Sequence, residues 1–134
     1  MVRDLFKRKK KEKTGAKQLE KVIITDLERI CGNDKEIYKA LQHTMFRDPR
    51  KIDVTMKEVT KKAAELEKKG DSIQARIQYH IAGGLALWKG DIAKVKQYFT
   101  KCAELAPEMD YGPITKIPEK GVEKAQEFYK KFLK

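Results

Sequence analysis

The side chains of this chain that could carry acid–base chemistry are few and widely spaced. His43 and His80 are the two histidines among 134 residues, and neither lies in a sequence cluster of cysteines or carboxylates with metal-ligand spacing. Arg76 precedes His80 by one helical turn, so these two side chains share a helix face. The sequence has no glycine-rich phosphate loop after a strand and no nucleophile elbow. We therefore predict no metal, no cofactor, no small-molecule substrate and no catalytic residue.

The Arg76–His80 pair leaves one catalytic alternative open. The stretch LEKKGDSIQAR, residues 66–76, resembles the HEPN-type ribonucleases, which use an arginine and a histidine on one helix. That resemblance implies ribonuclease chemistry at Arg76 and His80, although the family's motif separates the two by more residues than this chain does. The other interpretation, which we favour, is a partly exposed pair on a helix surface.

Length and composition predict one soluble domain. The 134 residues fit a single domain, and 38% charged with 40% apolar residues is typical of a globular chain. The longest apolar run, Ile81 to Trp88, is far shorter than the ~20 residues of a membrane helix, and the N-terminus has no apolar signal region. Cys31 and Cys102 stand alone, which predicts reduced, buried thiols and a cytoplasmic protein. Abundant Lys and Glu, with one serine and one asparagine, resemble the composition of thermophile proteins.

Positive charge is concentrated at the N-terminus. The net charge is +11, and residues 1–17 hold eight Lys or Arg against two Asp or Glu. We predict that residues 1–15 form a basic flexible tail. The tail could bind nucleic-acid phosphates in a salt-sensitive way, could contact an anionic membrane by inserting Val2, Leu5 and Phe6, or could only keep the protein in solution. The candidates for contacting an anionic partner are Arg3, Lys7, Arg8, Lys9, Lys10, Lys11 and Lys13.

Residues 16–134 predict a single helical domain of about six helices without a sheet. Apolar residues recur at helical spacing in residues 16–31, 34–48, 55–70, 71–89, 92–106 and 119–133. Residues 107–118 predict a proline-rich loop before the last helix. The segment 71–89 is apolar on every side in its second half, which predicts a central helix covered by its neighbours.

Two identical corners join the middle three helices. Lys69-Gly70-Asp71 and Lys89-Gly90-Asp91 each place a glycine after one helix and an aspartate before the next. Glycine adopts the left-handed conformation that ends a helix, and an aspartate side chain caps the N–H groups that begin the following one. Links this short force antiparallel neighbours, so these helices should form stacked hairpins.

The region around the second corner resembles the tetratricopeptide repeat, a helical hairpin of about 34 residues. Residues 76–107 match it at Tyr79, Gly83, Gly90, Asp91, Tyr98, Phe99, Glu104, Leu105 and Pro107, whereas Val95 and Cys102 stand where the repeat usually has alanine. A partial copy, residues 59–79, overlaps the first. The resemblance implies antiparallel hairpins stacked in a right-handed array, with the helix 119–133 as a C-terminal cap.

The same resemblance implies a groove that binds a peptide or a partner protein. The residues that would face this groove, or lie at its edge, are Ile77, His80, Gly84, Leu87 and Trp88. An apolar groove suits an amphipathic helix, and the chain's own helix 119–133 could fill it instead. The adjacent glycines Gly83 and Gly84, which are costly inside a helix, predict a close approach of a neighbouring helix or a notch for a ligand.

The function predicted from the sequence is therefore a non-enzymatic protein–protein interaction module that binds a protein or peptide partner or associates with itself. A nucleic-acid-binding protein that uses the basic tail and surface lysines is the alternative, and peripheral contact with a membrane is a weaker one.

Overall fold

The structure, a computed structural model, describes residues 26–133, and every regular element in this range is helical. The prediction of an all-α fold is confirmed for these residues. The predicted tail with its seven cationic candidates, and the first part of the predicted helix 16–31, lie outside the described range. Residues 26–31 are helical, and Gly32, with a φ of 63°, follows the end of this segment. No described helix combines the length and apolar character needed to span a membrane.

Local capping residues begin the first two complete helices. The side chain of Asp34 accepts a hydrogen bond from a backbone N–H in the first turn of α2 (Lys35–Thr44). Thr55 and Glu58 form a reciprocal capping box at the start of α3 (Met56–Lys68). Both caps depend only on residues that lie close together along the chain.

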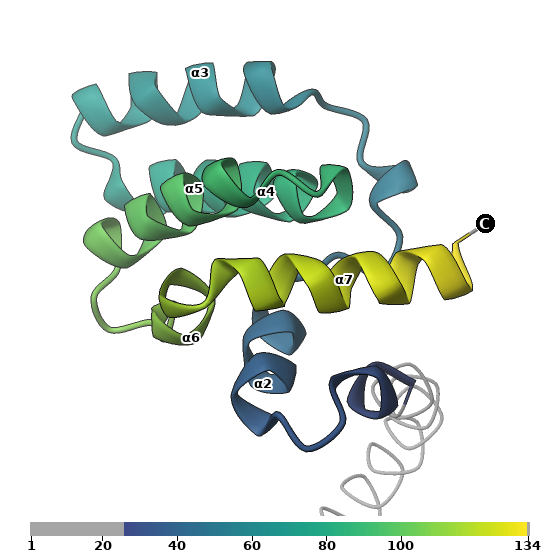
Figure 1. The fold of residues 1–134 in the computed structure, drawn as a ribbon. Coiled ribbons are helices and arrows are strands. Elements are labelled where there is room, and N and C mark those ends of the chain that lie inside the picture. Colours follow the sequence, from purple (N-terminus) through teal and green to yellow (C-terminus); the bar gives the residue numbers. More distant parts are fainter. Residues whose placement is uncertain (1–25, 134) are drawn as a thin grey trace, which may run out of the picture.

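The two corners fold the chain as predicted. Gly70 and Gly90 have φ values of 82° and 73°, in the left-handed region that favours glycine. They precede α4 (Ser72–Lys89) and α5 (Ile92–Leu105), and the aspartate after each glycine accepts a 3.1 Å hydrogen bond from the first helical turn. The three helices α3, α4 and α5 consequently run antiparallel in succession (Figure 1).

The segment predicted as a proline-rich loop contains a helix that the sequence did not indicate. Within residues 107–118 the chain forms α6 (Gly112–Lys116), and α7 (Pro118–Phe132) begins one residue before the predicted start. Proline lies in the first turn of both helices, where its missing N–H breaks no helical hydrogen bond. A short 3₁₀ helix, η1 (Pro49–Lys51), is also additional to the prediction.

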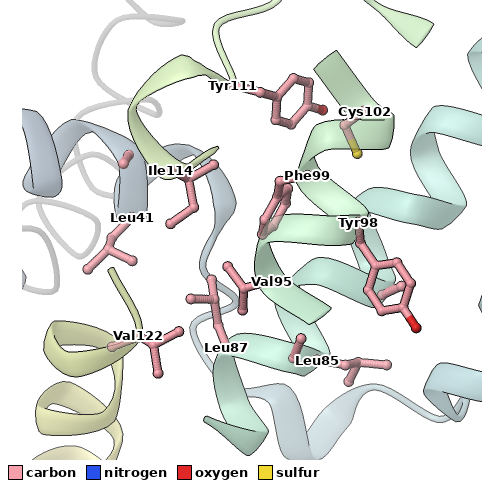
Figure 2. Close-up of a cluster of buried hydrophobic side chains, with 14 of the residues drawn as sticks. Leu41, Leu85, Leu87, Val95, Tyr98, Phe99, Cys102, Tyr111, Ile114 and Val122 are labelled. Atoms are coloured by element: carbon pink, nitrogen blue, oxygen red, sulfur yellow. The ribbon is translucent and has the colours of Figure 1, made fainter. Parts of the chain in front are cut away.

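Helix α4 is the centre of the fold. Figure 1 shows α3 and α7 on opposite sides of the α4–α5 pair, with α2 beyond α7. Contacts join α4 to α2, η1, α3, α5 and α7, so the prediction that the chain covers it on several sides is confirmed. Figure 2 shows the core beside it, where Leu41, Ile114 and Val122 approach Leu87 and Val95.

Candidate functional site

Aromatic rings from other segments pack against the two adjacent glycines of α4, in the space that a side chain would fill. A Cβ atom on Gly83 would lie 2.5 Å from the ring of Phe99 in α5, and one on Gly84 would overlap the ring of Phe46, which follows α2. The predicted close approach of a neighbouring helix is confirmed at Gly83. At Gly84 the approaching group comes from the segment between α2 and η1 rather than from a helix.

The residues predicted to face a groove lie at different depths. Leu87 is fully buried and Gly84 is buried beneath Phe46, so neither presents a surface to a partner. Ile77, His80 and Trp88 are half-buried. Of these, Trp88 lines a hollow at the end of α4, whereas His80 belongs to a polar cluster near the middle of that helix. Partner binding by this set stays a prediction.

Helix α7 is fixed over the C-terminal end of α4 by polar contacts. The Gln126 side-chain amide donates hydrogen bonds of 2.6 Å to the carbonyl of Leu87 and 2.9 Å to that of Trp88. Both carbonyls belong to the last turn of α4, where the Leu87 carbonyl also accepts a hydrogen bond of 3.2 Å from the backbone N–H of Gly90. The Tyr129 hydroxyl donates to the Phe46 carbonyl at 2.6 Å, and its ring meets the Trp88 ring edge-on at 5.1 Å.

A hollow of about 570 Å³ lies between the end of α4 and α7, and we call it the α7 hollow. Its apolar lining comes from Trp88, Tyr129 and Leu133, and its polar lining from Gln126, Glu123, Glu127 and Lys130. Glu123, Glu127 and Lys130 are exposed residues of α7. The hollow therefore combines the half-buried Trp88, beside the buried Tyr129, with charged groups on one rim.

A second candidate, which we call the Tyr111 cluster, consists of Arg76, His80, Tyr111 and His43. The buried Tyr111 hydroxyl accepts a hydrogen bond of 3.2 Å from the Arg76 guanidinium and lies 2.9 Å from Nδ1 of His80. The His43 ring lies 5.5 Å from the His80 ring and 4.9 Å from the Tyr111 ring, measured between centroids. Both histidines of the chain thus meet at one tyrosine.

Burial sets the protonation of this cluster. Desolvation, with the nearby charges of His43 and Arg76, lowers the pKa of His80 from 6.5 to about 4. His80 is therefore neutral at pH 7, and it shares a hydrogen bond with the Tyr111 hydroxyl through Nδ1 while Arg76 donates to the same oxygen. Desolvation also lowers the pKa of His43, and it raises the pKa of the nearby Cys102 thiol to about 12.

This geometry gives the predicted Arg76–His80 pair a structural role. Both side chains hold the Tyr111 hydroxyl, which attaches the segment before α6 to α4. A neutral histidine with a pKa near 4 is a weak base at pH 7. Ribonuclease chemistry at this pair stays a prediction, and loss of cleavage in an R76A/H80A double variant would be its test.

Sequence reasoning did not identify Tyr111 or His43 as parts of this cluster. Tyr111 lies 35 residues after Arg76, in a segment expected to be a loop, and His43 belongs to a different helix from His80. No local spacing signals such long-range proximity. Among residues 26–133, no group of three or more histidine, cysteine, aspartate or glutamate side chains could hold a metal ion.

Comparisons with known proteins identify no relative. No protein-family model, no curated protein and no solved structure matches this chain. The tetratricopeptide resemblance therefore stays a prediction from the sequence, and the functional interpretation depends on the geometry described above.

Proposed function

We propose that this chain is a non-enzymatic interaction module that binds an amphipathic helix of a partner protein in the α7 hollow. The observation that carries the proposal is the half-buried Trp88, which lies beside Tyr129 and Leu133 in a hollow of about 570 Å³. Tryptophan and tyrosine are enriched among the residues that dominate binding energy at protein interfaces. An apolar side chain of the partner that entered the hollow would cover this aromatic surface.

Charges on the rim favour a particular partner sequence. Glu123, Glu127 and Lys130 recur at helical spacing along the exposed side of α7, so they form one line beside the hollow. The two carboxylates are notable in a chain with a net charge of +11. A partner helix with basic residues opposite the glutamates and an acidic residue opposite Lys130 would complement this line.

The rigidity of the hollow supports binding without rearrangement. Gln126 and Tyr129 tie α7 to backbone carbonyls of α4 and of the segment before η1. Val122 and Phe128 of the same helix are buried in the core. A surface that is already in place avoids the free-energy cost of ordering it on binding.

The antiparallel succession of α3, α4 and α5 supports the predicted tetratricopeptide-like stack. The carboxylate of Glu67 in α3 accepts hydrogen bonds of 3.0 Å from Tyr79 in α4 and 3.2 Å from Lys101 in α5. One side chain thus links three successive helices. Repeat stacks of this kind use helix surfaces and their edges to bind partners.

Selection of helical peptides from a display library against the immobilised protein tests the proposal. We expect the enriched peptides to be amphipathic, with basic residues beside the apolar face. Their affinity can be followed through the fluorescence of Trp88, the only tryptophan of the chain. Reversing two rim charges in an E123K/E127K variant should weaken binding about 10-fold.

A matched double variant, E65K/E104K, introduces the same charge change at exposed residues outside the hollow. It should bind the selected peptides within about 2-fold of the unmodified protein. Equal affinity of the two double variants, or no enrichment of amphipathic peptides, would overturn the proposal. So would a dimer that dissociates only in the E123K/E127K variant, because a second copy of the chain would then occupy the hollow.

A further inference from the structure

A smaller hollow, distinct in its lining from the α7 hollow, lies between α2 and the segment before α6. Its volume is about 310 Å³, and its lining consists of Lys39, Gln42, His43, Asp110 and Pro113. Lys39 and His43 are four residues apart on α2, so their side chains lie on one face of that helix. Asp110 and Pro113 come from the segment on either side of the α6 N-terminus.

Hydrogen-bond donors predominate on the α2 side of this hollow. The Lys39 ammonium, the Gln42 amide and an N–H of the His43 ring can each donate to a bound oxygen atom. All three residues are exposed. An oxyanion with several acceptor oxygens can satisfy three such donors at once.

The surrounding charge favours an anion as well. Arg76 is half-buried, and within residues 26–133 its side chain bonds to the Tyr111 hydroxyl and forms no ion pair with a carboxylate. Burial is the main cause of the lowered pKa of His43, Asp110 acts in the opposite direction, and the charge of Arg76 is close enough to lower this pKa further. Because no described carboxylate pairs with the half-buried guanidinium of Arg76, a bound anion can neutralise its charge.

Asp110 is the one carboxylate of the lining. It lies 3.8 Å from the Lys39 ammonium, and the two side chains are 62% and 73% exposed. An exposed ion pair at this distance contributes little stability, so Asp110 can turn into solvent when another anion approaches Lys39. The charge of Lys39, the other charged residue of the lining, is positive, as is the charge of Arg76, which acts on His43 from outside the lining.

We propose that this hollow binds the phosphate group of a phosphomonoester, with Lys39, Gln42 and His43 contacting its oxygens and Arg76 adding a second positive charge. A phosphate dianion matches both the positive charge and the number of donors. The volume lies near the lower end of the range for small-molecule sites, which leaves room for a short organic group beside the phosphate.

The ring signals of the two histidines in NMR spectra provide the test, because a chain with two histidines gives only two sets. Inorganic phosphate and O-phosphoserine serve as separate probes, with acetate as a carboxylate control. Each phosphate probe should shift the His43 signals in a saturable way. Tighter binding of O-phosphoserine would identify the ligand as an organic phosphomonoester. Tighter binding of inorganic phosphate would identify the ligand as the free phosphate ion.

Bound phosphate should also raise the pKa of His43, and the other groups around this ring are known. Lys39 belongs to the same helix, Arg76 and His80 approach from α4, and Asp110 and Tyr111 approach from the segment before α6. Repeating the titration of His43 in each variant that changes a charge separates the effects of these groups on the pKa of His43. The His80 signals report whether the fold is intact in each variant.

Three variants decide the outcome. Replacing Lys39 by methionine should weaken phosphate binding about 5-fold, whereas the same change at Lys35, which is exposed one turn earlier on α2, should leave it unchanged. Replacing Asp110 by asparagine should strengthen binding about 5-fold, because a like charge is removed. Equal effects of the two lysine variants, no gain in the D110N variant, or an equal response to acetate would overturn the proposal.

Discussion

Acid should destabilise this domain through His80. The folded domain lowers the pKa of His80 from 6.5 to about 4, so the unfolded chain binds a proton there more readily than the folded one. Stability contributed by this group is therefore complete above pH 6.5 and is lost as the pH falls from 6.5 toward 4. Below pH 4 the histidine is charged in both states, and no further loss comes from it.

The size of this effect follows from the two pKa values. Between pH 7.5 and pH 4.5 the free energy of unfolding should fall by about 2.5 kcal/mol on account of His80 alone. A small domain is typically stable by about 5–15 kcal/mol, so a loss of this size is readily measured. The physical source is burial of an imidazole beside the positive charge of Arg76 and the ring of His43.

Urea denaturation at pH 7.5 and at pH 4.5, on the unmodified protein and on an H80N variant, measures the effect. The asparagine amide reaches near the position of Nδ1, so it can still hydrogen-bond the Tyr111 hydroxyl, but it does not titrate. The carboxylates of Asp34 and Glu67, whose pKa values are lowered, contribute equally in both proteins. His43 likewise remains in both.

The unmodified protein should lose about 2.5 kcal/mol more than the H80N variant between these two pH values. An equal loss in the two proteins would refute the assignment of a buried, neutral His80. An NMR titration that placed the pKa of His80 in the folded protein near 6.5 would refute it independently.

Three other predictions concern packing. Replacing Gly83 by alanine should destabilise the domain by about 1–3 kcal/mol in urea denaturation, and more than the same change at Gly84, because the ring beside Gly83 is fully buried and the other is not. Removing the Tyr129 hydroxyl by a change to phenylalanine should cost about 1 kcal/mol, measured as a lowered Tm. The thiols of Cys31 and Cys102 are free and buried, with pKa values raised to about 11 and about 12, so at pH 8 they should react with a disulfide reagent only as fast as the domain opens.

Features determined by neighbouring residues could be predicted from the sequence. The cap at Asp34, the capping box at Thr55 and the glycine corners at Gly70 and Gly90 are all formed within a few residues of chain. The central position of α4 could be predicted as well, because its second half has no polar side to expose to solvent.

Features determined by distant contacts could not be predicted. Helix α6 lies in a segment rich in proline, and its Ile114 packs where a Cβ atom on Gly121 of α7 would stand. The repeat pattern placed Leu87 on a groove face, but coverage of that face depends on how α7 and the segment after α2 pack against α4. Tyr111 reaches His80 across 31 residues of chain, a distance that no periodicity encodes.

The most direct test of partner binding in the α7 hollow is NMR mapping of a selected amphipathic peptide on the full chain. Trp88 supplies the only indole N–H signal of the protein. The proposal predicts that this signal and the backbone amides of residues 122–133 shift together as the peptide saturates the protein. Shifts confined to the outer surfaces of α3 and α5, with the Trp88 indole unchanged, would contradict it.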